Sequence, residues 1–273
     1  MAAVVKPDTA PGLRSRMPSF RTSALPTWAS GLIGAVGVLA FWVFAAEVWG
    51  VRKGVPAPWK VVTHLMEDWH YYPTHLKATL GRAVQGYFWG NVIAIALALV
   101  FVLVPFLEKA LMQIAVATYC LPIIAIGPIL QVVLHGDAPK VALAALSVFF
   151  TTLIGMLVGL RSAEKTSLEL IRAYGGGTFM QLRKVRLRSA LPHLFGGLRI
   201  AAPAAVLGAI IGEYLGGEKG LGIFMINSQQ AFDVPRTWGV ALVSTAVAGA
   251  GFALTSVIAR LVTPWAPKAA KNS

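Results

Sequence analysis

Long runs of residues without charge are the feature that most limits what this chain can fold into. A helix needs about 20 apolar residues to cross the hydrocarbon core of a bilayer. Charge-free runs of that length occupy residues 22–46, 83–107, 110–134, 141–160 and 237–259. A further run, 194–215, carries only Arg199 near its beginning and Glu213 near its end. The sequence therefore predicts an all-α membrane protein with six transmembrane helices.

Composition excludes the main soluble alternatives. Charged residues make up 13% of the chain, about half of the roughly 25% found in soluble proteins, and hydrophobic residues make up 56%. In so apolar a chain the net charge of +13 points to cytoplasmic loops and membrane lipid, and we expect no nucleic-acid partner. The single cysteine, Cys120, excludes an internal disulfide and is expected to be a packed, unreactive thiol. The scattered histidines lack metal-binding spacing, so we predict no metal site.

The distribution of Lys and Arg predicts the orientation. With a cytoplasmic N-terminus, 16 of the 24 Lys and Arg residues fall on the cytoplasmic side, as the positive-inside rule favours. Both termini are then cytoplasmic, and Lys109 lies in the loop after the second span. Residues 1–27, which are rich in proline, are predicted to be a disordered cytoplasmic tail, and residues 267–273 a short C-terminal tail.

The loop after the fourth span, 161–192, is polar but has the pattern of ordered helices. Residues 165–174 place Leu168 and Ile171 on one face, with Tyr174 as a candidate third member, and three glycines, 175–177, end this helix. A second short helix is predicted from Phe179 to about Leu187, with Pro192 opening the fifth span. The apolar face of such a helical pair packs either on a partner protein or on lipid headgroups. The pattern alone leaves both open.

For several other segments and residues the sequence leaves alternative interpretations open. Residues 60–69 fit a short helix at the outer membrane interface or a solvated loop. Pro122 and Pro128, inside the third span, either free carbonyls to face a cavity or only kink the helix. The carboxylate of Glu213 is expected either in a cavity, at a partner or at a gating contact, or at the interface between membrane and water. Polar residues that could line a solute pathway, or serve only helix packing, are Asn91, Gln113, Tyr119, Gln131, Thr151 and Thr152.

The loop 161–192 also contains a motif of defined spacing. Glu169, Gly175 and Leu187 follow the pattern E-A-A, three residues, G, nine residues, I-x-L-P. The segment resembles the EAA loop of the permease subunits of binding-protein-dependent ABC transporters. Pro192 resembles the second proline that is typical of the branch of this family that serves sulfonates, taurine and nitrate. The departures from the pattern are Leu170, Ile171, Val185 and Arg188.

Three further blocks resemble the same family in the same order. Residues 75–86 resemble the segment before the second span, 121–128 the proline-bounded break in the third span, and 212–222 a turn with Glu followed by Gly-Leu-Gly. The resemblance extends over about residues 56–265. It implies a fold like that of type I ABC importers, in which a permease domain, here 28–266, has six transmembrane helices and a cytoplasmic coupling-helix loop.

The resemblance also implies partners and functional residues. The expected partners are a dimer of ABC ATPase subunits, a second permease copy that forms a homodimer with this chain, and a periplasmic or lipid-anchored binding protein that delivers the solute. The chain has no G-x-x-x-x-G-K-[ST] loop, so ATP and Mg²⁺ are expected on the ATPase partner and no cofactor or catalytic residue in this chain. The residues expected to dock on the ATPase are Glu169, Ala173, Tyr174, Gly175 and Leu187. Those expected in the pathway or its gate are Pro122, Pro128, Gln131 and Glu213.

The resemblance therefore implies a permease of the bacterial inner membrane that imports a small solute such as a sulfonate, taurine, nitrate or a similar anion. The alternative is a stand-alone secondary carrier, which would need a membrane-buried charged coupling site or inverted repeats. Neither is evident in the sequence. A membrane enzyme would need a cluster of titratable groups in or beside the spans, and none is evident either.

Overall fold

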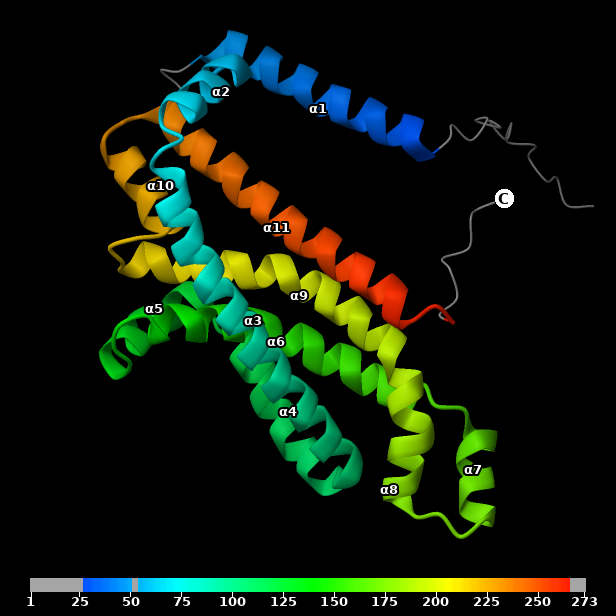
Figure 1. Ribbon diagram of the computed structural model, residues 1–273. Helices are drawn as coiled ribbons and strands as arrows, with labels where there is room; N and C mark the ends of the chain where they lie inside the picture. The colour runs from blue at the N-terminus through cyan, green and yellow to red at the C-terminus, as the bar shows by residue number, and fades with distance from the viewer. Residues whose placement is uncertain (1–26, 51–53, 266–273) are drawn as a thin grey trace, which may run out of the picture.

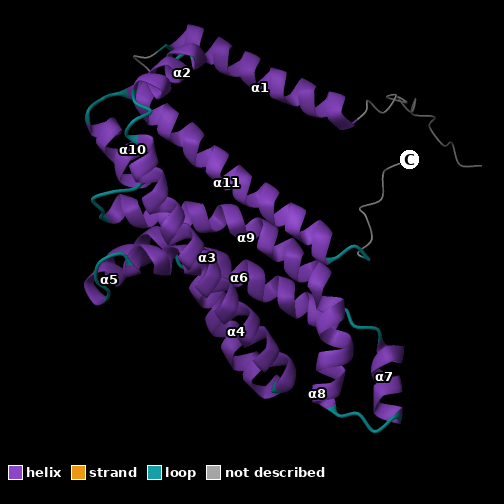
Figure 2. Ribbon diagram, viewed as in Figure 1, coloured by secondary structure: helices purple, strands orange, loops and turns teal. Residues whose placement is uncertain are grey.

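The computed structural model of the chain describes residues 27–50 and 54–265, and within them every regular element is a helix (Figure 2). The tails predicted over 1–27 and 267–273 lie outside the described residues, apart from Thr27, which begins the first helix. A π-helical turn, Leu182–Arg186, joins α8 to α9. The α-helices are α1 (Thr27–Trp49), α2 (Pro58–Glu67), α3 (Tyr72–Leu103), α4 (Pro105–Cys120), α5 (Ile123–Val133), α6 (Ala138–Arg161), α7 (Lys165–Ala173), α8 (Thr178–Gln181), α9 (Leu187–Leu215), α10 (Leu221–Gln230) and α11 (Val234–Val262).

The all-α membrane class is confirmed. Within the described residues, five helical stretches are long and apolar enough to cross a membrane: 29–49, 72–103, 138–161, 178–215 and 234–262. A sixth crossing is supplied by α4 and α5 if this pair, bent by 101°, counts as one span. The predicted total of six agrees with that count.

The boundary between the second and third spans differs from the prediction. The second span was expected to reach residue 107, with Lys109 in a loop, but α3 ends at Leu103 and Lys109 lies within α4. The reason is Pro105, which disfavours helical backbone at the residue before it. Val104 accordingly has φ −129° and ψ 81°, and the chain turns there.

The predicted helix break near Leu187 is wrong. The α8 segment, the π-turn and α9 form one continuous helix of 38 residues, 178–215. Arg188 replaces the first proline of the family pattern and keeps its backbone N–H, so nothing at this point forces the helix to end. The N–H of Leu187 donates to the carbonyl of Leu182, which closes the π-turn. Pro192 therefore lies inside α9 and does not begin it.

Close contact between backbones holds the centre of the bundle together. The central helix α6 packs on α9 and on α3, and α9 also packs on α11. Small residues permit this approach. A Cβ at Gly159 of α6 would lie 2.7 Å from the Cα of Ala190, and a Cβ at Gly86 of α3 would lie 2.9 Å from the backbone N of Ala145. Around these contacts lies an apolar core that includes Phe101, Leu153 and Leu160.

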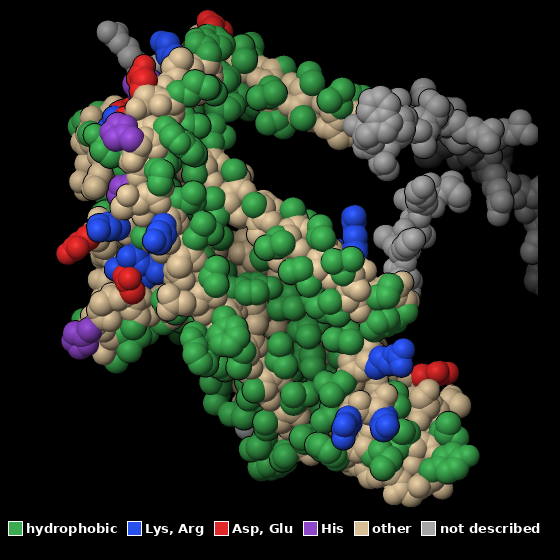
Figure 3. All heavy atoms as spheres, viewed as in Figure 1, with side chains coloured by type: hydrophobic (Ala, Val, Ile, Leu, Met, Phe, Trp, Pro, Cys, Tyr) green, Lys and Arg blue, Asp and Glu red, His purple; other side chains and the backbone are tan. Residues whose placement is uncertain are grey.

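The bundle has two distinct ends (Figure 1). One, called here the α10 end, carries α2, α10 and the loop 216–220, and the opposite α7 end carries α7 and α8. Charged side chains gather at both ends, and the surface between them is mostly hydrophobic (Figure 3). The segment 60–69 is largely the helix α2, which packs on α11 through the fully buried Val61, so the alternative of a solvated loop is wrong.

Replacing Gly159 with Ala tests the close packing of α6 on α9. The added Cβ would meet the backbone of Ala190, and such overpacking costs about 1–3 kcal/mol. We expect Gly159→Ala to lower the thermal unfolding temperature of the detergent-solubilised protein. Gly81→Ala is the matched control, because a Cβ at Gly81 meets nothing within 4 Å. Equal unfolding temperatures for the two variants would contradict this account of the packing.

Candidate functional site

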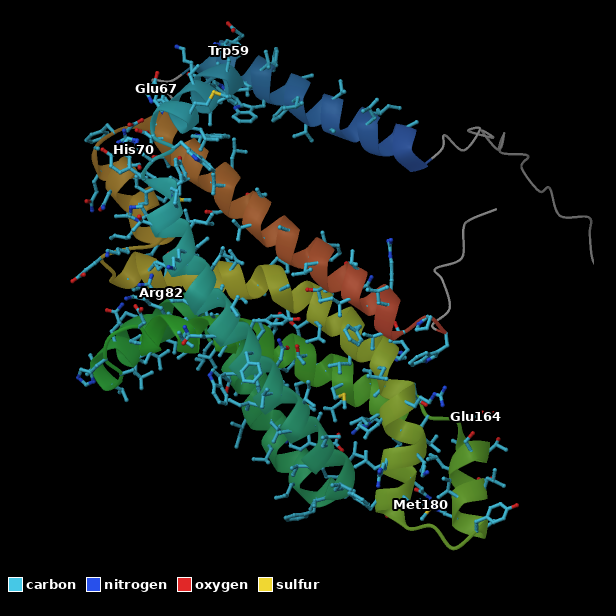
Figure 4. The ribbon with its side chains drawn as sticks, in the orientation of Figure 1. Trp59, Glu67, His70, Arg82, Glu164 and Met180 are labelled. Carbon is cyan, nitrogen blue, oxygen red and sulfur yellow. The ribbon has the colours of Figure 1, made fainter. Side chains whose placement is uncertain are left out.

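The first candidate site is the hairpin at the α7 end, residues 162–181. In Figure 4, Glu164 marks the beginning of α7, and Met180 marks the α8 limb. The predicted apolar face, Leu168 and Ile171, is partly buried, and Nε2 of the buried Gln181 donates to the carbonyl of Leu168 at 3.2 Å. The hairpin therefore covers part of that face with its own second limb.

A different apolar set remains uncovered. Leu170 is 58% exposed, Tyr174 83% and Phe179 69%. Large apolar side chains rarely gather on a polar surface without a binding role. The hairpin thus presents Leu170, Tyr174 and Phe179 for contact with something outside this chain.

Gly175 shapes the tip of the hairpin. Its φ of +77° is in the left-handed region, which residues with a Cβ rarely adopt. The N–H of Gly176 donates to the carbonyl of Ile171 at 2.8 Å, and the N–H of Gly175 to that of Arg172 at 2.9 Å. These two bonds form a Schellman motif, which ends α7 and turns the chain sharply.

The structure brings together four of the five residues expected to dock on an ATPase. Glu169, Ala173, Tyr174 and Gly175 are all exposed at or near the tip of the hairpin. Leu187 lies apart from them, at the first residue of α9, where it packs against the apolar core.

The second candidate site is a buried carboxylate at the α10 end. Glu213 of α9 has no exposed surface. Oγ1 of Thr79 donates to its carboxylate at 2.9 Å, Nη1 of Arg82 at 2.8 Å, and the backbone N–H of Gly222 at 2.9 Å. The expectation that Glu213 reaches the membrane interface is therefore wrong, because three donors hold it inside the protein.

Arg82 extends this network to two other segments. It lies on α3 near the crossing with α9 (Figure 4). Its Nη1 donates to the carbonyl of Lys219 at 2.6 Å, and its Nη2 lies 2.8 Å from Oδ1 of Asp137. Lys140 contacts the same Asp137 oxygen at 2.9 Å. Hydrogen bonds from Lys140 and Arg82 hold the pKa of Asp137 below its usual value, so this carboxylate stays ionised at neutral pH.

The loop before α10 is built around the same carboxylate. The N–H of Leu221 donates to Oγ1 of Thr79 at 2.8 Å, and the N–H of Gly220 lies 3.1 Å from Nδ1 of His75. Gly220 has φ +134°, and a Cβ there would collide with the carboxylate of Glu213. The glycines of the predicted Gly-Leu-Gly turn thus let the backbone approach Glu213 closely.

Two interpretations of the sequence need correction here. No buried pair of opposite charges was evident from the sequence, but Arg82 and Glu213 form one inside the protein. Thr79, Arg82 and His75 were parts of a family-like block without an assigned role. The signal that could have found them is a pair of opposite charges, Arg82 and Glu213, each at the same predicted end of an otherwise apolar span, because a charge in that position needs a partner.

A chamber of about 810 Å³ opens beside the network. Gln131, which was expected in the pathway, lines it from α5, together with Arg82, Asp137 and Lys140. The chamber is thus polar and carries both signs of charge.

The two prolines of the third span have different positions. Pro122 lies in the break between α4 and α5, and Pro128 lies within α5. At Pro122 the helix is therefore interrupted and does not merely bend. Cys120, at the end of α4, is exposed, so the expectation of a packed thiol is wrong for this chain on its own.

Two of the other polar candidates, Asn91 and Thr152, are partners of each other. Oγ1 of Thr152 on α6 donates to Oδ1 of Asn91 on α3 at 2.5 Å, and both residues are buried. This bond serves helix packing. Tyr119 differs, because its ring is 63% exposed and stacks on Phe150 with centroids 4.3 Å apart.

These features define a class of protein: a multi-span membrane transport subunit with a helical hairpin outside its apolar belt. Residues 90–266 match the family of the binding-protein-dependent transport system inner membrane component. The chain belongs to this family, whose members are permease components of ABC transport systems and not enzymes themselves. It is accordingly a multi-pass protein of the inner membrane.

Curated relatives are similar over most of the chain. The formylaminopyrimidine transport permease protein ThiX of Halalkalibacterium halodurans is 30% identical over 85% of this chain and 93% of its own length. The riboflavin transport system permease protein RibX of Chloroflexus aurantiacus is 32% identical over 70% of this chain and 72% of its own. The putative aliphatic sulfonates transport permease protein SsuC of Bacillus subtilis is 22% identical over 87% and 88%. These relatives include a member of the sulfonate branch that the motif resembles.

Neutralising Glu213 tests the buried network. Glu213→Gln leaves Arg82 without a buried counter-charge, which costs about 3–5 kcal/mol. We expect a clear loss of thermal stability in detergent, and we expect Arg82→Gln combined with Glu213→Gln to lose less than the sum of the single variants. The matched control is Glu218→Gln, at an exposed glutamate in the adjoining loop. If Glu213→Gln is as stable as this control, the network does not hold the α10 end together.

Proposed function

We propose that this chain is the membrane-spanning subunit of an ATP-driven importer, and that the hairpin 162–181 docks on an ABC ATPase subunit. The observation that carries the proposal is the exposed apolar set of Leu170, Tyr174 and Phe179 on a polar, basic loop. A partner protein covers such a set more favourably than water does. Lipid headgroups are the other possible cover, and the docking experiment below separates the two.

The hairpin is well built to transmit force. Its second limb continues without a break through the π-turn into α9, which carries Glu213 near its far end. Movement of an ATPase subunit against α7 would therefore tilt a helix that reaches the α10 end. Rigid-body tilting of this kind is a common form of conformational change.

The orientation of the chain follows from the same proposal. The ATPase subunits act on cytoplasmic ATP, so the α7 end and both termini are cytoplasmic, as the distribution of Lys and Arg favours. The α10 end then faces the periplasm. A periplasmic or lipid-anchored binding protein would deliver solute there, beside the chamber lined by Arg82, Gln131 and Lys140.

A complete pathway requires a second permease copy. The described helices supply at most six spans, and we propose that two identical chains pair about a twofold axis. The chamber and the α4–α5 break, with Pro122, Pro128 and Gln131, would then contribute to the path between them.

The solute is a small molecule of the kind that the relatives carry. Their names include aliphatic sulfonates as well as formylaminopyrimidine and riboflavin. The sequence motif favours a small anion, whereas the two relatives with the higher identity carry heterocycles.

The buried Arg82–Glu213 pair is the one observation that favours the rival function, a secondary carrier. A coupling site must release and rebind an ion during transport. Glu213 is instead neutralised by Arg82 and bonded to two further donors, which suits a fixed structural role.

Substitutions at the hairpin test the docking proposal. Tyr174→Ala removes an exposed aromatic contact, and Gly175→Val strains the Schellman turn, because its φ is +77°. We expect each variant to reduce recovery of the ATPase subunit with the tagged permease by about tenfold or more, since aromatic interface residues often contribute 2 kcal/mol or more. Membrane insertion should be unchanged.

Tyr71→Ala is the matched control for docking, because Tyr71 is also an exposed tyrosine but precedes α3 at the opposite end. This variant should retain the ATPase. ATP-independent uptake by the permease alone would overturn the proposal in favour of the carrier. Unchanged ATPase recovery with Tyr174→Ala and Gly175→Val, together with crosslinks from the hairpin to lipid, would favour headgroup contact.

Labelling of introduced cysteines tests the orientation. In a Cys120→Ser background, Glu164→Cys reports on the α7 end and Glu218→Cys on the α10 end. An impermeant maleimide added to intact spheroplasts should label the second variant and not the first. After lysis both should react, which confirms that each site is accessible, and the reverse pattern would invert the topology.

A further inference from the structure

The break between α4 and α5 interrupts a pair of helices that together have the length and composition of one membrane span. The α4 helix ends at Cys120 and α5 begins at Ile123, and the two meet at 101°. Non-helical backbone at membrane depth is tolerated only where protein buries it or where it lines a cavity containing water. Tyr119, Cys120 and Leu121 are exposed, so this chain does not bury the break itself.

The break forms one wall of a cavity of about 410 Å³. Such a volume lies within the roughly 300–1,000 Å³ range of small-molecule sites. Tyr119 and Pro122 line it from the break, Ser147 and Phe150 from the middle of α6, and Leu207 from α9. The cavity is thus shaped by three helices of the bundle.

The chemistry of the cavity does not suit an anion. None of the side chains that line it, all in the described part of the chain, belongs to Lys, Arg, His, Asp or Glu. The N-terminus of α5 carries a partial positive charge, but the C-terminus of α4 beside it carries a partial negative charge. The two oppose each other, so the break favours neither sign.

The break nevertheless offers hydrogen bonds. The last carbonyls of α4 and the first N–H groups of α5 have no partners within their own helices. Acceptors and donors therefore meet at the break. The hydroxyl groups of Thr118 and Ser147, which line the same cavity, donate to carbonyls of their own helices and so present only their oxygen lone pairs as acceptors. Such a mixed edge is complementary to a polar but uncharged molecule.

An aromatic pair forms another part of the wall. The rings of Tyr119 and Phe150 stack with an interplanar angle of 19°. Because Tyr119 remains 63% exposed, its ring can take part in a second stacking contact. A flat ring bound there would combine stacking with hydrogen bonds to the break.

We propose that this cavity is a solute site on the translocation path and that it takes a planar, uncharged nitrogen heterocycle. The inference rests on the proposed function, since it assumes that the chain conducts a solute, and it names the class of that solute. The helices α5 and α6 line both this cavity and the polar chamber at the α10 end, whereas α9 lines the cavity and the loop that follows it lines the chamber. They connect the entrance to the site.

The native Cys120 provides a direct test. It is the only cysteine of the chain and it lines the cavity. In the complex of permease and ATPase in nanodiscs, a water-soluble maleimide should label Cys120. Riboflavin or a formylaminopyrimidine, added at about 2 to 9 times its Kd, should slow the labelling by about 3- to 10-fold, because the rate falls with the fraction of sites left empty. Ethanesulfonate, an anion without a ring, should leave the rate unchanged.

Two variants of Tyr119 identify the contact. Tyr119→Phe keeps the ring and should keep the protection of Cys120, whereas Tyr119→Leu should abolish it. Phe252→Leu, an aromatic change at a half-exposed position of α11, is the control and should behave like the unaltered protein. Normal recovery of the ATPase with each variant shows that the complex is assembled.

Several results would overturn the proposal. Cys120 that resists the water-soluble reagent but reacts with a lipid-soluble one would mean that lipid fills the cavity. Protection of Cys120 by ethanesulfonate and not by the heterocycles would assign the site to anions. If none of these probes slows the labelling of Cys120, the cavity is not a solute site. Each leaves the ATP-driven importer intact, whereas uptake without an ATPase subunit would overturn the importer itself.

Discussion

The arrangement of the α10 end depends on one carboxylate that water does not reach. Glu213 is held by Thr79, Arg82 and the backbone of Gly222, so a side chain of α9 joins α3 to the beginning of α10. Burial removes water that would otherwise solvate the charge, and each of these donors therefore has to be in place. Arg82 passes the constraint on to Asp137 at the beginning of α6. One buried ion pair thus fixes where three spanning helices meet.

Much of the fold could be predicted from the sequence, because a bilayer demands long apolar helices and the charge-free runs show where they are. The predictions were less accurate where helices change direction. Pro105 turned the chain earlier than the run 83–107 indicated, and Arg188 allowed a helix to continue where a proline would have favoured an end. Such boundaries depend on single residues, whereas the spans depend on averages over many.

The candidate sites, too, could be predicted from the sequence only in part. The helix of the hairpin and its end at Gly175 were predictable, since periodicity and glycine act locally. Which apolar residues it exposes was not, because Leu168 and Ile171 are partly covered by a limb that comes later in the chain. The contacts of Glu213 join residues more than 130 positions apart, and one sequence contains no direct record of such pairs. The stacked rings of Tyr119 and Phe150 are a further case.

The π-turn at Leu182–Arg186 has a geometric consequence for the hairpin. A π-turn holds one residue more than an α-turn, and each residue of an α-helix rotates the chain by about 100°. Loss or gain of a single residue at this point would therefore swing α7 around the axis of α9 while the spanning part kept its own packing. The residue count of this turn thus sets the direction in which α7 faces relative to the helices within the membrane, and the continuous helix fixes that direction.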